Sequence, residues 1–281
     1  MPHKQTRIGV TRRLPKEIEL RMSELFDVTY HEADTALDAP ELAAMMADID
    51  VLVPTVTDRL DRQLIEQAGP RLKLIANFGN GTDNIDIDAA HERGIIVSNT
   101  PSVLTGDTAD MAMALILALP RRLVEGDRIM HQEGAFTGWS PNWMLGRRLA
   151  GKTLGIVGMG RIGQAIARRA AAFDIKVVYH NRNRLHPDIE AQCGASYFDN
   201  LDRMLREVDI VSLNCPHTPA TYHLLSARRL ALLQPHAIVV NTSRGEVIDE
   251  DALADRLTSG DIGGAALGRI PLNATGSGMV Y

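Results

Sequence analysis

One segment of this 281-residue chain constrains its fold more than any other, the glycine-rich sequence at residues 158–163. An apolar stretch at residues 153–157 has the composition of a buried strand and leads into Gly-Met-Gly-Arg-Ile-Gly. Apolar residues then recur at helical spacing through residues 162–173, and residues 176–180 form a second apolar strand segment. Strand, glycine turn, helix and strand in this order predict a βαβ unit of a doubly wound parallel sheet.

The three glycines of this turn have separate physical roles. Gly158 permits a tight turn, Gly160 lets the backbone approach a pyrophosphate, and Gly163 lets the helix pack closely on the strand. The helix start offers unpaired N–H groups and a partial positive charge to phosphate oxygens. The segment therefore predicts a dinucleotide site. Its candidate cofactor-binding residues are Gly158, Met159, Gly160, Arg161, Ile162 and Gly163.

The end of the second strand indicates which dinucleotide is preferred. NAD-binding versions commonly place Asp or Glu there for the ribose 2′-hydroxyl, whereas this chain has Asn181, Arg182, Asn183 and Arg184. With no carboxylate near them in the sequence, two guanidinium groups would attract the 2′-phosphate of NADP. The alternative is a solvated basic turn. We therefore expect NADP(H) as the preferred cofactor and keep NAD as a possible one.

The remainder of the chain has the pattern of an α/β protein. Residues 7–98 alternate predicted strands, at 7–11, 51–56, 72–76 and 94–98, with helices at 15–25 and 86–93. A break at residues 99–101 precedes a long apolar helix predicted over 108–134, and a Gly/Trp/Pro-rich stretch at 138–151 leads to the glycine turn. We place a domain boundary near residue 100.

Composition limits the classes of partner. The net charge is −5, and Arg-Arg pairs at 121–122, 147–148, 168–169 and 228–229 are scattered, which argues against nucleic acid. The two cysteines lack metal-ligand spacing, so we expect no metal and a reducing, cytoplasmic setting. The longest apolar run, 111–119, is too short to span a bilayer, and the first residues lack a signal-peptide core.

Several motifs occur together and in a characteristic order. They are residues 84–88 with 94–101, residues 108–114, residues 151–163, residues 209–213 with 216–218, and residues 241–249. In these motifs the chain resembles, from about residue 50 to residue 267, the D-isomer-specific 2-hydroxyacid dehydrogenases, above all their glyoxylate/hydroxypyruvate reductase branch. The resemblance implies a flavodoxin-like substrate-binding domain at 1–99 and a Rossmann-type NADP-binding domain at 100–281. It also implies NADPH-dependent reduction of small 2-oxo acids to D-2-hydroxy acids, by a homodimer that forms through the 108–134 region.

The resemblance assigns roles to particular residues. Arg244 matches the arginine that grips the substrate carboxylate and the C2 oxygen, a task suited to a planar guanidinium. Asn80 and Gly81 match the loop whose backbone N–H groups hold the same carboxylate. The alternatives are a salt-bridged surface arginine and a plain strand-end turn. Further positions that match the cofactor lining are Thr108, Cys215, Thr242 and Ser243.

The sequence departs from the family after Leu267. The family's proton donor is a histidine held by a glutamate, both beyond the substrate arginine, but no histidine follows His236 here. His217, Glu246 and Asp249 carry no catalytic assignment, and Asp249 is predicted to cap a helix. We expect residues 268–281 to be truncated or out-of-frame sequence, with a genuine short variant as the alternative. Two other functions stay open: a phosphoglycerate- or formate-type dehydrogenase, and a catalytically silent NADP(H)-binding protein.

Overall fold

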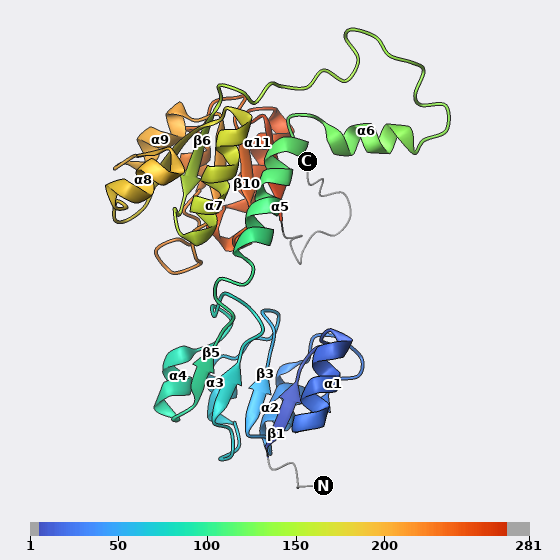
Figure 1. Cartoon of the computed structure of the whole chain (residues 1–281), viewed down its shortest axis with the longest axis vertical. Coiled ribbons are helices and arrows are strands. Elements are labelled where there is room, and N and C mark those ends of the chain that lie inside the picture. The colour runs from blue at the N-terminus through green and yellow to red at the C-terminus, as the bar shows by residue number, and fades with distance from the viewer. Residues whose placement is uncertain (1–5, 269–281) are drawn as a thin grey trace. The chain divides into compact units, whose positions relative to one another are not determined.

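The structure is a computed structural model that describes residues 6–268, and the chain divides into two compact units, residues 1–104 and 105–281 (Figure 1). Among the described residues of the first unit, five parallel strands lie in the order β2-β1-β3-β4-β5. The strands are β1 (Arg7–Val10), β2 (Asp27–Tyr30), β3 (Val51–Val53), β4 (Leu74–Ala76) and β5 (Ile96–Ser98). The helices are α1 (Lys16–Leu25), α2 (Ala39–Met46), α3 (Arg62–Glu66) and α4 (Ile87–Glu92). This strand order is that of flavodoxin-like folds.

The second unit holds a larger parallel sheet. Among residues 105–268, six strands lie in the order β11-β10-β9-β6-β7-β8, which is the Rossmann order. They are β6 (Thr153–Val157), β7 (Lys176–His180), β8 (Ala195–Tyr197), β9 (Ile210–Leu213), β10 (Ile238–Asn241) and β11 (Gly264–Leu267). The α-helices are α5 (Thr105–Ala118), α6 (Leu123–Met130), α7 (Arg161–Ala170), α8 (Pro187–Cys193), α9 (Leu201–Glu207), α10 (Ala227–Leu230) and α11 (Glu250–Ser259). Short 3₁₀ helices lie at η1 (Ala171–Phe173) and η2 (Gly245–Val247). The predicted fold class is confirmed.

Both faces of this sheet are covered, which explains its apolar strands. In β10, Ile238 and Val240 join the core that contains residues of α5 and α7, whereas Val239 faces the core formed with α9 and α11. Successive strand residues point to opposite faces, so a strand buried on both sides is mostly apolar along its length. Each fully buried side chain of this size contributes about 1.5–3 kcal/mol to folding. The sheet is therefore a rigid support for the loops at its carboxyl edge.

The prediction of a single helix over 108–134 is wrong. The structure has two helices there, α5 and α6, because the chain turns at residues 119–122. Pro120 cannot donate a helical hydrogen bond, and Arg122 has a left-handed backbone with φ 55°. Arg122 then pairs with Glu125 in the first turn of α6. Figure 1 shows that α6 and residues 131–150 project from the body of the second unit.

The shorter elements of the first unit differ from prediction in extent. The strand predicted at 51–56 ends at Val53, since Pro54 follows and has no N–H to donate. Helix α2 was not predicted, although Asp38 and Glu41 form a capping box at its start. Among residues 6–268, no helix has both the length and the apolar composition needed to cross a membrane.

Candidate active site

The glycine turn lies where the strand order of the larger sheet reverses. β6 ends at Val157, and its neighbour β9 ends at Leu213 in register with it. Gly158 has φ 97°, and a Cβ on it would lie 2.6 Å from the backbone nitrogen of Cys215 and 2.7 Å from the carbonyl carbon of Asn214. Only glycine therefore fits this contact between the two loops. Doubly wound sheets bind their ligands at such a reversal, at the carboxyl ends of the strands.

The other two glycines of the turn differ in what surrounds them. A Cβ on Gly163 would lie 2.5 Å from the Gly158 oxygen and 3.1 Å from Cγ2 of Ile156, so the start of α7 packs directly on the turn. A Cβ on Gly160 would have no atom within 4 Å. Gly160 is the N-cap of α7, and no side chain caps the helix there. The open space at an uncapped helix start fits a pyrophosphate, as the sequence predicts.

The end of β7 is hydrogen-bonded to this turn. Oδ1 of Asn181 accepts a hydrogen bond from the backbone N–H of Met159 at 2.7 Å, and the Tyr197 hydroxyl donates to the Asn181 carbonyl at 3.2 Å. The amide of Asn181 thus stabilises the glycine turn. Arg182 therefore directly follows a residue whose position beside the turn is fixed.

The expectation that neither arginine has a carboxylate nearby is wrong for Arg184. Its Nε and Nη2 donate to the two carboxylate oxygens of Glu190 at 2.9 and 2.8 Å. The Tyr179 hydroxyl also donates to Glu190, at 2.6 Å. The bonds from Arg184 and Tyr179 lower the pKa of Glu190 to about 2, and burial together with Glu190 raises the pKa of Tyr179 to about 12. Arg184 is therefore paired with a carboxylate that is ionised at neutral pH.

Arg182 and Asn183 are in a different situation. Both are exposed, and within the described part of the chain neither side chain makes a hydrogen bond or an ion pair. Arg161, in the first turn of α7, is exposed as well. Of the two arginines after β7, only Arg182 has a guanidinium that is not engaged by a carboxylate within residues 6–268.

The loop after β10 carries Arg244 on a fixed backbone. Asn241, 5% exposed, accepts hydrogen bonds on Oδ1 from the N–H and the hydroxyl of Ser243, at 2.9 and 2.7 Å. Its Nδ2 donates to the Arg244 carbonyl at 2.8 Å. Arg244 itself is half-buried, and its Nη1 donates to the Ser243 carbonyl at 3.0 Å. Asn241 was not predicted as a site residue, although a polar residue ending the strand Ile-Val-Val-Asn was the signal.

Two other predicted cofactor residues, Cys215 and Thr242, follow β9 and β10 at the same edge of the sheet, as does Asn214, which was not predicted. Oγ1 of Thr242 and Oδ1 of Asn214 are buried, and neither has a hydrogen-bond partner among the described residues. A buried polar atom without a partner is costly by about 1–3 kcal/mol, and a ligand could supply one. Burial raises the pKa of the Cys215 thiol to about 11, so it stays protonated and lines the site as a neutral group. Thr108 is half-buried near the start of α5, and Asp249 caps α11 as predicted, through a bond from the Ala252 N–H.

In the first unit, the loop that contains Asn80 and Gly81 follows β4. The amide of Asn77, 2% exposed, donates to the Gly81 carbonyl at 2.7 Å, and the Asn99 amide donates to the Asn80 carbonyl at 2.7 Å. Both carbonyls are therefore held by side chains of the protein. Asn80 is exposed and Gly81 half-buried, so the backbone of this loop is accessible as well as fixed.

Behind this loop lies a buried polar network that sequence reasoning did not predict. Oδ2 of Asp58, a residue only 1% exposed, accepts bonds from Oγ1 of Thr11 at 2.6 Å and from the Thr55 N–H at 2.7 Å. Nδ2 of Asn84 donates to the carbonyls of Thr55 and Asp58 at 3.1 Å each and to Oδ1 of Asn77 at 3.4 Å. The network thus connects the ends of β1 and β3 with Asn77, which holds the loop.

Comparison with known proteins identifies the family. The model of the D-isomer specific 2-hydroxyacid dehydrogenase NAD binding domain matches residues 113–269, more than half of the chain. The glyoxylate reductase of Thermococcus litoralis is 43% identical over 264 residues, which cover 93% of this chain and 79% of that protein. The chain belongs to the D-isomer specific 2-hydroxyacid dehydrogenases. The resemblance found in the sequence and the oxidoreductase class are thereby confirmed.

Solved structures agree with this family. The TT0316 protein of Thermus thermophilus superposes with a TM-score of 0.88 at 40% identity, over 98% of this dehydrogenase and 85% of that chain. An acyclic imino acid reductase in complex with NADPH and D-Arg has a TM-score of 0.82 at 27% identity, over 93% and 82% of the two chains. Of residues 268–281, which are expected to depart from the family, residues 269–281 lie outside the described residues.

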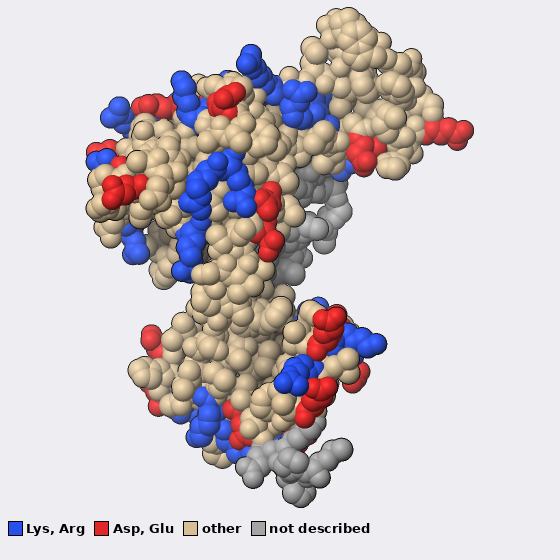
Figure 2. Space-filling model, viewed as in Figure 1, with Lys and Arg blue, Asp and Glu red and all other residues tan. Residues whose placement is uncertain are grey.

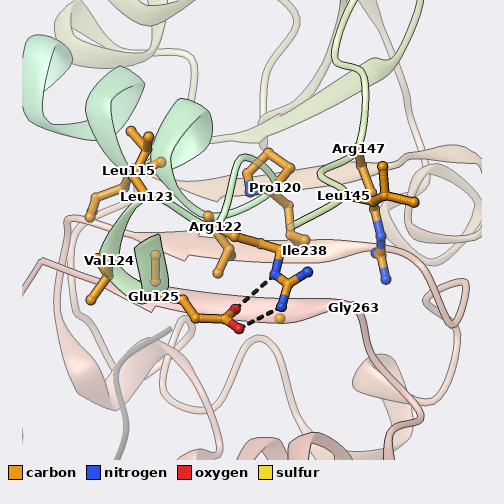
Figure 3. Close-up of a pocket in the computed structure, with 14 residues that line it drawn as sticks. Leu115, Pro120, Arg122, Leu123, Val124, Glu125, Leu145, Arg147, Ile238 and Gly263 are labelled. Carbon is orange, nitrogen blue, oxygen red and sulfur yellow. Dashed lines mark hydrogen bonds and ion pairs between the residues drawn. The ribbon is translucent and has the colours of Figure 1, made fainter. Parts of the chain in front are cut away.

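The second unit of the dehydrogenase also contains a cavity of about 360 Å³ (Figure 3). It is lined by Leu115 of α5, by Leu119 directly after that helix, by Leu123 and Val124 of α6, and by Ile238, the first residue of β10. Gly264, the first residue of β11, also lines it. Ile238 and Gly264 stand at the amino ends of their strands, whereas the glycine turn follows the carboxyl end of β6. The cavity is therefore separate from the dinucleotide site.

Proposed function

We propose that this dehydrogenase is an NADPH-preferring reductase of small 2-oxo acids, glyoxylate or hydroxypyruvate, which it converts to glycolate or D-glycerate with a hydride from NADPH and a proton from water. The observation that carries the proposal is the glycine turn with its open space at Gly160, which is hydrogen-bonded through Met159 to Asn181, the residue that precedes the exposed Arg182. The similarity to a glyoxylate reductase at 43% identity supports this substrate class.

The substrate proposal depends on Arg244. A 2-oxo acid presents a carboxylate and an adjacent carbonyl, and a guanidinium can donate to both while it polarises the carbonyl. Arg244 is half-buried on a loop braced by Asn241, so its position is defined before substrate binds. The accessible backbone N–H groups of Asn80 and Gly81 are proposed to hold the substrate carboxylate.

The cofactor proposal depends on the end of β7. No acidic side chain stands at position 181, and the Asn181 amide is engaged with Met159. Repulsion of a 2′-phosphate by a carboxylate at this position is therefore avoided, and Arg182 offers a positive charge. An NADPH complex among structurally similar reductases supports the same preference.

The experiment is oxidation of NADPH and NADH by the purified chain with a panel of 2-oxo acids. We expect turnover with glyoxylate or hydroxypyruvate and a higher kcat/KM with NADPH than with NADH. Preference for a phosphorylated 2-oxo acid, or oxidation of formate, would instead support one of the other dehydrogenase types. Tight NADPH binding with no turnover on any substrate would support a catalytically silent binding protein.

We also propose that the chain forms a homodimer through the 108–134 region, which holds most of α5 and all of α6, together with the adjoining residues 135–150. Figure 2 shows mainly uncharged side chains over the projecting part of this region. Several of its large apolar residues are exposed, with Leu123 at 58%, Met130 at 63% and Trp139 at 77%. Exposed apolar patches of this kind mark interaction surfaces. Sedimentation should give a dimer, which Trp139→Ser with Met130→Ser should convert to a monomer; a monomeric wild type would refute this proposal.

A further inference from the structure

Glu190 stands out among the carboxylates near the proposed 2′-phosphate site because it is already bonded to one of the two arginines. The Arg184–Glu190 pair is bidentate, with distances of 2.9 and 2.8 Å, and the Glu190 side chain is only 10% exposed. The Tyr179 hydroxyl holds the same carboxylate, and the Leu185 N–H donates to that hydroxyl at 2.9 Å. Both groups of the ion pair are thus fixed in position by the fold.

This pairing changes the electrostatics of the basic turn. A carboxylate bonded to two donors of a guanidinium cancels most of its positive field, and it repels any anion that approaches the same group. Arg182 has no such carboxylate among the described residues. Two arginines two positions apart in sequence are therefore unequal as ligands of a phosphate.

We propose that Glu190 is a specificity-determining residue of the cofactor site: by engaging Arg184 it leaves the 2′-phosphate to Arg182 and moderates the preference for NADPH over NADH. This inference rests on the proposed NADPH preference. On this inference Arg184 stabilises the turn through its ion pair with Glu190 and does not bind the 2′-phosphate.

The experiment measures dissociation constants of NADPH and NADH by fluorescence titration of the reduced nicotinamide, so that catalysis is not needed. The variants are Glu190→Gln, Arg184→Ala, their combination, and Arg182→Ala. Gln keeps an acceptor for the Tyr179 hydroxyl, removes the charge, and replaces one of the two oxygens that accept from Arg184 by an amide NH2 group. Asp188→Asn is the matched control, because it removes the same charge from α8 at an exposed side chain that does not contact Arg184. A thermal melt of each variant verifies folding.

We expect Glu190→Gln to tighten NADPH binding roughly three- to tenfold at low ionic strength, with NADH changed less than twofold. Added salt should reduce this gain, since it is electrostatic. Arg184→Ala should alter the NADPH/NADH ratio little in the wild type but remove the gain in the Gln background, and Asp188→Asn should have little effect.

Unchanged or weaker NADPH binding in a folded Glu190→Gln variant would overturn the inference, because Glu190 would then be neutral toward the phosphate or would orient Arg184 for it. An equal gain in Asp188→Asn would also overturn it, since net charge alone would be responsible. Arg182→Ala tests the proposed preference separately. An unchanged NADPH/NADH ratio in this variant would contradict the assignment of the 2′-phosphate to Arg182, whereas a wild type that binds NADH more tightly than NADPH would contradict the NADPH proposal itself.

Discussion

Two neighbouring glycines of the dinucleotide turn should respond in opposite ways to the same substitution. In Gly163→Ala, the new methyl group would lie 2.5 Å from the Gly158 oxygen. Because this oxygen belongs to the backbone of the turn, relief requires the turn or the helix to shift. Overpacking of this kind costs about 1–3 kcal/mol, which lowers the melting temperature of a unit of this size by about 2–12 °C.

Gly160→Ala should leave the fold nearly unchanged. Its methyl group would have no atom within 4 Å, and the backbone at φ −77° and ψ −160° is open to alanine. The free energy of unfolding should stay within about 1 kcal/mol of the wild-type value. Alanine is a less favourable N-cap than glycine, but it also lowers the conformational entropy of the unfolded chain, and the two effects oppose each other. The methyl group would instead occupy space that the pyrophosphate needs. We expect at least tenfold weaker NADPH binding, or about 1.4 kcal/mol.

The assay combines a thermal melt with a fluorescence titration of NADPH on the same preparations. The account predicts an unstable Gly163→Ala protein and a stable Gly160→Ala protein that binds poorly. Wild-type affinity in Gly160→Ala would refute the placement of the pyrophosphate. Wild-type stability in Gly163→Ala would refute the packing argument.

Three further predictions concern other parts of the site. Arg244→Gln should lower kcat/KM for glyoxylate at least about a hundredfold, the loss expected for a charge-assisted bidentate contact, while NADPH affinity stays within about twofold. Asp58→Ala should raise the KM for glyoxylate by loosening the loop at Asn80, without weakening NADPH binding, and should cost about 1–3 kcal/mol in urea unfolding. Because the folded-state pKa of Glu190 lies below its ordinary value, at about 2, its ion pair stabilises the protein above about pH 4.5 and is lost as the pH falls towards 2. The difference in melting temperature between wild type and Glu190→Gln should therefore shrink over this range, and a constant difference would contradict the pairing.

The features predicted from sequence are those encoded locally. Residues 153–180 contain every element of the βαβ unit in one continuous segment, and the structure reproduces it with β6, α7 and β7. Strands β9 and β10 are buried on both faces, and their sequences, Ile-Val-Ser-Leu and Ile-Val-Val-Asn, are accordingly mostly apolar. By contrast, β2 has only half-buried alternate residues, and α3 has five residues, too few for a helical period.

Two of the features that sequence reasoning missed depend on tertiary packing. A third was encoded in the sequence but was not used. The Arg184–Glu190 pair forms only because α8 turns back onto β7 and brings Glu190 next to Tyr179. The Asp58 network joins residues 47 positions apart, such as Thr11 and Asp58, which no local pattern connects. The break between α5 and α6 was readable, since Pro120 stands within the apolar stretch.

The most direct test of the proposed function is the oxidation of NADPH by glyoxylate, followed through the absorbance of the reduced nicotinamide, with wild type and Arg244→Gln side by side. The account predicts glyoxylate-dependent oxidation by the wild type, faster with NADPH than with NADH, and a near-complete loss in the variant. Tight NADPH binding by the wild type without any glyoxylate- or hydroxypyruvate-dependent oxidation would contradict it.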